Sequence, residues 1–326
     1  MFISEQEGPR QGAFVYSCRM HDESAVFRVG GGSIELRRGD RVFATLPVSF
    51  SEVRPFLKWT GGKQWLAPIA TEIVPPEFCG TYHEVFLGGG ALFFALRPSF
   101  ARLSDTNEEL IATYAAVRDQ CDEVIETLSR YPHDADFYDR LRKRKPRKPW
   151  TTAARFIYLN KTAFNGIYRV NRQGKFNVPF GRYQNPTICQ EDRLRIASNA
   201  LGTASVEVAD FEAAMENVVP GDFVYLDPPY ITGHRNNGFV KYNSRLFSWS
   251  DQERLAVAAK RLSQRGAWVL VSNADHPNVW GLYEGFNRYT VTRASLVGGP
   301  LSSRGETQEV LLANYPIAGV PTLKVV

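Results

Sequence analysis

The chain has 326 residues, 44% hydrophobic and 22% charged, which is typical of a folded globular protein and excludes a disordered one. Its formal net charge of +5 permits a nucleic-acid partner without requiring one. The four cysteines (Cys18, Cys79, Cys121 and Cys189) are far apart and predict reduced thiols rather than disulfides or a zinc site. There is no apolar run of the roughly 18 residues that a membrane span needs, and no signal-peptide pattern. We therefore expect a cytoplasmic protein without membrane contact.

The first fifty residues differ from the rest in their pattern of apolar residues and glycines. Short strand-like runs at 25–29 and 33–37 are joined by three glycines, and 41–46 is a candidate third strand. We expect residues 1–50 to form a small β-rich appendage, whose role the sequence does not reveal.

From residue 55 onward, short apolar runs alternate with helix-like stretches. The expected strands are Tyr82–Phe86, Ala101–Ser104, Ser205–Val208, Asp222–Leu226 and Ala267–Val271, and the longest expected helices are Glu108–Leu128 and Asp251–Gln264. This alternation predicts an α/β fold with a doubly wound, mostly parallel sheet. Ligands should then bind beyond the carboxyl ends of the strands.

One long interval breaks the alternation. Residues 112–200 are helical at first and then rich in Arg, Lys, Asn, Gly and aromatic residues. An insertion of this size predicts a second domain, so that residues 51–111 and 201–326 together make up the main α/β domain.

The strongest chemical signal is the run Asp227-Pro228-Pro229-Tyr230, directly after an apolar strand. An exocyclic amino group of adenine is a poor nucleophile because its lone pair is delocalised into the ring. Asp227 and the carbonyl of Pro228 can accept its hydrogens and aim the lone pair at a methyl donor, while the prolines stiffen the loop. Tyr230 offers a ring on which a flipped base can stack. The alternative is an ordinary Pro-Pro turn after a buried strand.

Three other stretches match a nucleotide-like ligand. Phe86-Leu87-Gly88-Gly89-Gly90 follows a strand, and its glycines permit close approach of backbone to ligand. Asp105 ends the next strand, where a carboxylate can bind ribose hydroxyls or simply cap a helix. Trp59 and Lys63 belong to Lys-Trp-Thr-Gly-Gly-Lys, which supplies a ring and a cation, although a plain turn with a solvated lysine has the same composition.

In this order, K-W-T-G-G-K, F-L-G-G-G, S-D-T-N and D-P-P-Y resemble the motifs of Dam-type DNA adenine-N6 methyltransferases, over about residues 55 to 315. The resemblance implies a Rossmann-like methyltransferase fold, S-adenosylmethionine as methyl donor, double-stranded DNA as substrate, and a mainly helical target-recognition domain at 112–200. The positions that match the family's cofactor contacts are Trp59, Lys63, Phe86, Gly88, Gly90, Asp105 and Asp227. Those that match its catalytic motif are Asp227, Pro228, Pro229 and Tyr230.

Residues 158–183 contain a block that resembles the one with which GATC-recognising relatives read DNA. The resemblance implies that Ile167, Arg169 and Pro179 help to read the site, and Asn165 and Asn171 are further candidates. Asn and Arg side chains can form paired hydrogen bonds with adenine and guanine edges in the major groove. The resemblance implies a GATC site or another site that contains GA, with Arg169 directed at a guanine, although related enzymes with this block read longer sites. A hairpin with a solvated basic face is the structural alternative.

Two further segments are candidates for contact with DNA. Seven of the nine residues in Arg140–Lys148 are basic, which indicates either a solvated loop or contacts with DNA phosphates. Residues 233–249 follow the catalytic motif, and we expect them to close over a flipped base.

Other functions have weaker support in the sequence. The five histidines show no metal-binding spacing, and sulfonium transfer needs no metal, so we expect none. A cytosine-N4 enzyme would use the same chemistry, usually with serine in place of Asp227, and a catalytically silent DNA-binding module remains a different class of alternative. A monomer or weak dimer, with or without a partner restriction endonuclease, is compatible with the sequence.

Overall fold

The computed structural model describes residues 14–20, 23–30, 33–38, 41–47, 54–171, 173–230, 247–294, 306–317 and 324–325, with side chains for 54–171, 173–230, 247–291 and 309–317. The chain divides into two compact units, Met1–Val53 and Arg54–Val326. They are described separately.

The first unit contains one antiparallel sheet of four strands. These are β1 (Phe14–Met20), β2 (Glu23–Gly30), β3 (Ser33–Arg38) and β4 (Arg41–Pro47), paired in chain order. Each strand pairs with its sequence neighbour because the connections are only a few residues long. The strand runs expected from the sequence are confirmed, and β1 is an additional strand that the sequence analysis missed.

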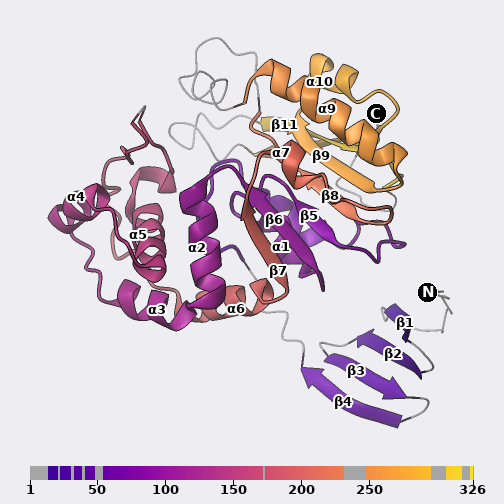
Figure 1. Cartoon of the computed structure of the whole chain (residues 1–326), viewed down its shortest axis with the longest axis horizontal. Coiled ribbons are helices and arrows are strands. Elements are labelled where there is room, and N and C mark those ends of the chain that lie inside the picture. The colour runs from indigo at the N-terminus through magenta and orange to yellow at the C-terminus, as the bar shows by residue number, and fades with distance from the viewer. Residues whose placement is uncertain are drawn as a thin grey trace. The chain divides into compact units, whose positions relative to one another are not determined.

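The second unit is built on one mixed sheet (Figure 1). Its strands are β5 (Tyr82–Glu84), β6 (Ala101–Asp105), β7 (Ala204–Val208), β8 (Phe223–Leu226), β9 (Trp268–Ala274), β10 (Asn287–Ala294), β11 (Glu306–Ala313) and β12 (Lys324–Val325). The order is β12-β10-β11-β9-β8-β5-β6-β7. The block β9-β8-β5-β6-β7 is parallel, whereas β10, β11 and β12 are joined by antiparallel pairings. The predicted α/β fold with a mostly parallel sheet is confirmed.

Helices cover this sheet and extend from one end of it. They are η1 (Gln64–Ile69), α1 (Ala91–Leu96), α2 (Glu108–Asp119), α3 (Cys121–Ser129), α4 (Ala135–Lys143), α5 (Pro149–Thr162), η2 (Phe164–Gly166), α6 (Glu191–Leu201), α7 (Phe211–Ala214), α9 (Trp249–Gln264) and α10 (Pro277–Leu282). Apolar side chains of α7, α9 and α10 share one core cluster with β8, β9 and β11. At the β7 end, α2 packs against α5, with α3 and α6 beside them (Figure 1). None of the helices in the described part combines the length and apolarity of a membrane span.

The expected helix Glu108–Leu128 is wrong as a single element. The structure breaks it at Gln120, whose φ of −141° and ψ of 43° are not helical, and α3 starts at Cys121. Neither glycine nor proline marks this break. It lets α3 turn and bury Val124 and Leu128, which a straight continuation would place elsewhere.

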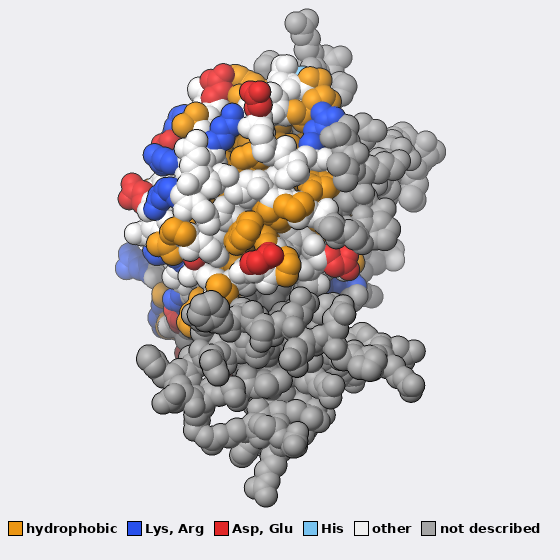
Figure 2. Space-filling model, turned by 90° about the vertical axis from the view of Figure 1, so that its right-hand side faces the viewer, with side chains coloured by type: hydrophobic (Ala, Val, Ile, Leu, Met, Phe, Trp, Pro, Cys, Tyr) orange, Lys and Arg blue, Asp and Glu red, His pale blue; other side chains and the backbone are white. Residues whose placement is uncertain are grey.

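The surface on the side away from α4 and α5 carries no continuous basic strip in its described part. Figure 2 shows that acidic and basic side chains are interspersed there and that the apolar ones form short strips. The Arg140–Lys148 run lies at the opposite end, at α4 and the loop after it (Figure 1).

A buried carboxyl group connects β5 to the first helix. Glu84 is 3% exposed, and it accepts hydrogen bonds from the Tyr82 hydroxyl (2.7 Å) and the Phe93 backbone N–H (3.1 Å) in α1. Burial is the main cause that raises the pKa of Glu84 to about 8. The group therefore keeps its proton in the folded protein across a range in which an unfolded chain has lost it.

We predict that Glu84→Gln removes a pH dependence of stability. Because the folded pKa is raised above its usual 4.5 to about 8, the wild-type unfolding free energy should fall as pH rises through this window, by at most about 1.4 kcal/mol per pH unit. Urea unfolding at several pH values measures the slope. The exposed Glu72→Gln is the control and should retain it. Equal slopes in wild type and Glu84→Gln would contradict the prediction.

Candidate active site

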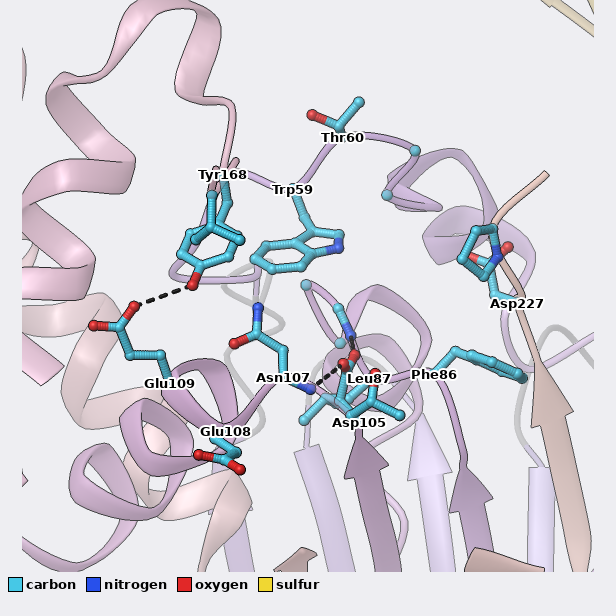
Figure 3. Close-up of a pocket in the computed structure, with 18 of the residues that line it drawn as sticks. Trp59, Thr60, Phe86, Leu87, Asp105, Asn107, Glu108, Glu109, Tyr168 and Asp227 are labelled. Carbon is cyan, nitrogen blue, oxygen red and sulfur yellow. Dashed lines mark hydrogen bonds between the residues drawn. The ribbon is translucent and has the colours of Figure 1, made fainter. Parts of the chain in front are cut away.

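A groove runs along the carboxyl ends of the parallel strands. Its volume is about 1410 Å³, more than the 300–1,000 Å³ that is usual for one small-molecule pocket. The four sequence motifs meet here: the lining includes Trp59, Lys63, Phe86, Gly88, Gly90, Asp105, Asp227, Pro228, Pro229 and Tyr230. Figure 3 shows Trp59 in the middle of the groove, with Asp105 below its ring and Asp227 across from it. The groove has room for a nucleotide-like ligand and a base together.

The carboxylate of Asp227 is fixed on one side only. Its Oδ1 accepts a hydrogen bond from the Ser272 hydroxyl (2.7 Å) and forms an ion pair with the Lys63 ammonium (2.9 Å). Its Oδ2 has no partner among the described residues. One oxygen thus anchors the group, and the other can accept a hydrogen bond from a ligand in the groove.

Burial raises the pKa of Asp227, whereas the charge and hydrogen bond of Lys63 and the hydroxyl of Ser272 lower it. The Asp227 side chain is 18% exposed and that of Lys63 only 4%. The lysine therefore helps keep this half-buried carboxyl group ionised, so that both of its oxygens can accept hydrogen bonds.

Buried polar side chains hold the Pro-Pro turn from behind. The Tyr225 and Ser272 hydroxyls lie 2.9 Å apart. Since Ser272 donates to Asp227, Tyr225 must be the donor in this pair. Gln252 of α9 donates to the Pro229 carbonyl (3.2 Å) and accepts from Asn273 (3.1 Å). Neighbouring residues at the end of β9 thus fix both ends of the turn.

Glu309 of β11 supports the same site. It is 1% exposed, accepts a hydrogen bond from the Tyr230 hydroxyl (3.1 Å), and has a carboxylate oxygen 3.8 Å from the Lys63 ammonium. The ammonium also lies 4.6 Å from the centre of the Tyr230 ring. Sequence analysis missed Glu309, Ser272 and Gln252. Only Ser272 carried a signal in the sequence, as a polar residue near the end of the otherwise apolar strand β9.

The glycine loop depends on its lack of side chains. Gly88 and Gly90 have φ values of +46° and +64°, where L-residues are strained. A Cβ on Gly88 would lie 2.7 Å from the Trp59 indole nitrogen. The loop therefore lets Trp59 lie directly against its backbone. Phe86, at the other side, packs on Phe211 with ring centres 5.9 Å apart.

Asp105 is tied to this loop rather than to the following helix. Its oxygens accept from the backbone N–H groups of Gly88 and Asn107, both at 3.0 Å (Figure 3). The side chain that caps α2 is Asn107, through Leu110 N–H, so the helix-cap alternative for Asp105 does not apply. Burial raises the pKa of Asp105, and the backbone N–H groups oppose this shift. Each oxygen retains capacity to accept another hydrogen bond.

The expected DNA-reading residues lie around a hairpin held by the Val170–Phe176 bridge. Arg169 is exposed, and its Nε donates to Asn177 Oδ1 (3.0 Å), which leaves its terminal nitrogens available. Asn165 and Pro179 are exposed, and Ile167 is half-buried. The Oδ1 of Asn171 accepts from the backbone N–H groups at 173 and 175, so this oxygen shapes the turn.

Basic residues continue the groove beyond the hairpin. Arg142, Lys143, Arg144 and Lys145 line it, and all but the half-buried Arg142 are exposed. The expected closing loop, 233–249, falls mostly on residues 231–246, outside the described residues. Among the residues whose positions are described, no group of three or more His, Cys, Asp or Glu could hold a metal ion.

Comparisons with known proteins identify the family of this chain. The family of D12 class N6 adenine-specific DNA methyltransferases matches residues 59–295. The type II methyltransferase M1.LlaDCHI of Lactococcus lactis subsp. cremoris is 37% identical over 273 residues, 81% of this chain and 96% of the relative. The type II methyltransferase M.MjaIII of Methanocaldococcus jannaschii is 36% identical over 81% of this chain and its own full length. DNA adenine methylase of Escherichia coli (strain K12) is 30% identical over 83% of this chain and 99% of its own length. The chain belongs to the D12 class of N6 adenine-specific DNA methyltransferases.

Proposed function

We propose that this enzyme moves a methyl group from S-adenosylmethionine to the N6 atom of an adenine rotated out of double-stranded DNA. The observation that carries the proposal is the half-anchored carboxylate of Asp227. Its Oδ1 is held by Ser272 and Lys63, and its Oδ2 has no partner in the described part of the chain. It lies beside an open groove large enough for a base and a nucleoside-like donor.

The protein's role in the reaction is to orient the target adenine and to polarise its amino group. Asp227 Oδ2 and the Pro228 carbonyl accept the two amino hydrogens, which draws N6 toward a tetrahedral geometry and directs its lone pair. Tyr230, fixed through Glu309, is the stacking surface for the base. The proton that N6 loses leaves through solvent in the open groove.

The cofactor end of the groove fits a nucleoside. We assign the ribose hydroxyls to Asp105, the adenine ring to Trp59 and Phe86, and close backbone approach to Gly88 and Gly90. Lys63 points at Asp227 in this structure and can share its ammonium with a ligand carboxylate. S-adenosylmethionine supplies a sulfonium-bound methyl group, which is electrophilic without a metal ion.

DNA recognition is assigned to residues 112–200, and cofactor binding and catalysis to 51–111 and 201–326. In the recognition domain, Arg169 reads a guanine, and Asn165, Ile167, Asn171 and Pro179 complete the reading of GATC or another site that contains GA. The orientation of Arg169 by Asn177 supports this assignment, because a pre-oriented guanidinium loses less entropy on binding. Mapping of N6-methyladenine in DNA from cells that express the protein tests the site.

The names of two relatives support a proposal about the biological role of the enzyme. Two of them are named type II methyltransferases. We propose that this chain likewise protects DNA against a partner restriction endonuclease, and that it acts in the cytoplasm as a monomer or weak dimer.

Asp227→Ala should lower turnover by about 10²-fold or more, because the amino group loses its acceptor. Tritium transfer from labelled S-adenosylmethionine to duplex DNA measures it. Asp119→Ala, at an exposed carboxylate of α2, is the control and should retain wild-type turnover. Near-normal turnover of Asp227→Ala would refute the assignment.

Lys63→Met should shift the acid limb of the pH–rate profile upward. The lysine lowers the pKa of Asp227, so its removal raises that pKa further and keeps the carboxyl protonated, unable to accept, up to a higher pH. The profile of turnover at saturating cofactor and DNA shows the shift. An acid limb unchanged from wild type would show that Lys63 does not control this ionisation.

Arg169→Ala should relax discrimination at one guanine by about 1–3 kcal/mol. Methylation mapping with wild type and variant measures it as the ratio of modified sites that differ at that base. Arg144→Ala is the matched basic control: it should weaken binding to all sequences and reduce the salt slope by about one, without a change in site preference. Unchanged discrimination in Arg169→Ala would place the guanine contact elsewhere.

A further inference from the structure

The residue between two proposed reading positions packs against other aromatic rings. Tyr168 lies between Ile167 and Arg169, and its ring packs on Phe156 (centres 4.9 Å apart) and stacks on Trp59 (5.9 Å, with 19° between the planes). Figure 3 shows the two rings side by side. The reading hairpin therefore contacts the proposed cofactor pocket directly.

The glycine loop confines Trp59 from another direction. A Cβ on Gly88 would lie 2.7 Å from the indole nitrogen, and one on Gly89 would lie 3.1 Å from the Trp59 Cβ. The indole cannot move toward this backbone. The glycine loop thus closes one side of the indole, and the Tyr168 ring stacks against it on another.

A second connection joins the same two segments. Asn160 of α5 accepts from the Lys58 N–H (2.8 Å) and donates to the Lys58 carbonyl (2.6 Å). Its amide also donates to the Gly166 carbonyl (3.4 Å), at the start of the hairpin. The backbone next to Trp59 and the backbone that leads to Tyr168 thus share one buried carboxamide.

The hydroxyl of Tyr168 extends the connection toward the basic run. It donates to Glu109 Oε2 (3.0 Å), and Glu109 Oε1 pairs with Arg155 Nη1 (2.5 Å). Arg155 is 6% exposed and donates to the carbonyls of Leu141 and Arg142 at the end of α4. One series of hydrogen bonds therefore connects Tyr168, which stacks on Trp59, with the basic segment at the end of α4.

We propose that the Trp59–Tyr168 stack couples cofactor binding to DNA binding, with Tyr168 as the positioning residue. A ligand ring that orders Trp59 also orders Tyr168 and the hairpin that carries Arg169. The conformational entropy lost when the first ligand binds is then not lost again when the second one binds. Each ligand then raises the affinity for the other by the same factor. This inference rests on the proposed function, since it takes Trp59 as a cofactor contact and Arg169 as a base contact.

The test is a binding cycle that needs no turnover. Affinity for a fluorescein-labelled duplex containing the mapped site is measured by anisotropy, with and without saturating S-adenosylhomocysteine. The cofactor product is titrated by calorimetry, with and without the duplex. We expect a coupling factor of about 5 to 150 in wild type, the usual range for linked sites. Tyr168→Leu should lower it to below about twofold, since coupling near one means independent sites, and Tyr168→Phe, which retains the ring, should keep most of it.

Phe176→Leu is the matched control, because Phe176 packs on Tyr168 from within the hairpin (5.8 Å). It should weaken DNA binding equally with and without S-adenosylhomocysteine, so the coupling factor stays that of wild type. A wild-type factor of one, or an unchanged factor in Tyr168→Leu, would overturn the inference while both ligands still bind. A wild-type protein that binds no S-adenosylhomocysteine would instead refute the proposed function itself.

Discussion

The site depends on an ion pair that keeps a half-buried carboxylate charged. Removing the Asp227 carboxylate from water without a partner would favour its protonated form, which accepts hydrogen bonds poorly. Lys63, 2.9 Å away, offsets that cost, and the Ser272 hydroxyl holds the same oxygen. The second oxygen is thereby left to a ligand. Separating the two groups would leave an uncompensated charge in the protein interior, which destabilises the fold. The surrounding structure must therefore hold Asp227 and Lys63 close together.

The sheet topology keeps these groups together. Asp227 follows β8, Ser272 lies in the adjacent β9, and Glu309 lies in β11, the next strand beyond it. Lys63 precedes η1 and reaches the same edge. Groups up to 246 residues apart in sequence, as Lys63 and Glu309 are, thus meet because parallel strands end together and β11 inserts between β9 and β10. The same edge carries the glycine loop after β5 and Asp105 at the end of β6, so methyl donor and base are brought to one groove.

Much of this arrangement could be predicted from the sequence. The strand-like stretches that precede Asp105 and Asp227 place both carboxylates at strand ends, and the parallel topology then brings them to one edge. Residues that act through tertiary contacts gave no comparable signal. Ser272, Gln252 and Glu309 cannot be told apart from their polar sequence neighbours until β9, α9 and β11 are placed. The break at Gln120 has no local marker, and the inward orientation of Tyr168 follows from its packing on Trp59 and Phe156, which no spacing rule encodes.

The central claim is the identity of the methylated atom. Duplex DNA incubated with the purified protein and S-adenosylmethionine labelled with ¹³C in its methyl group can be digested to nucleosides and analysed by mass spectrometry. The account predicts that the label appears in N6-methyldeoxyadenosine. Label in N4-methyldeoxycytidine, or in no nucleoside, would contradict it.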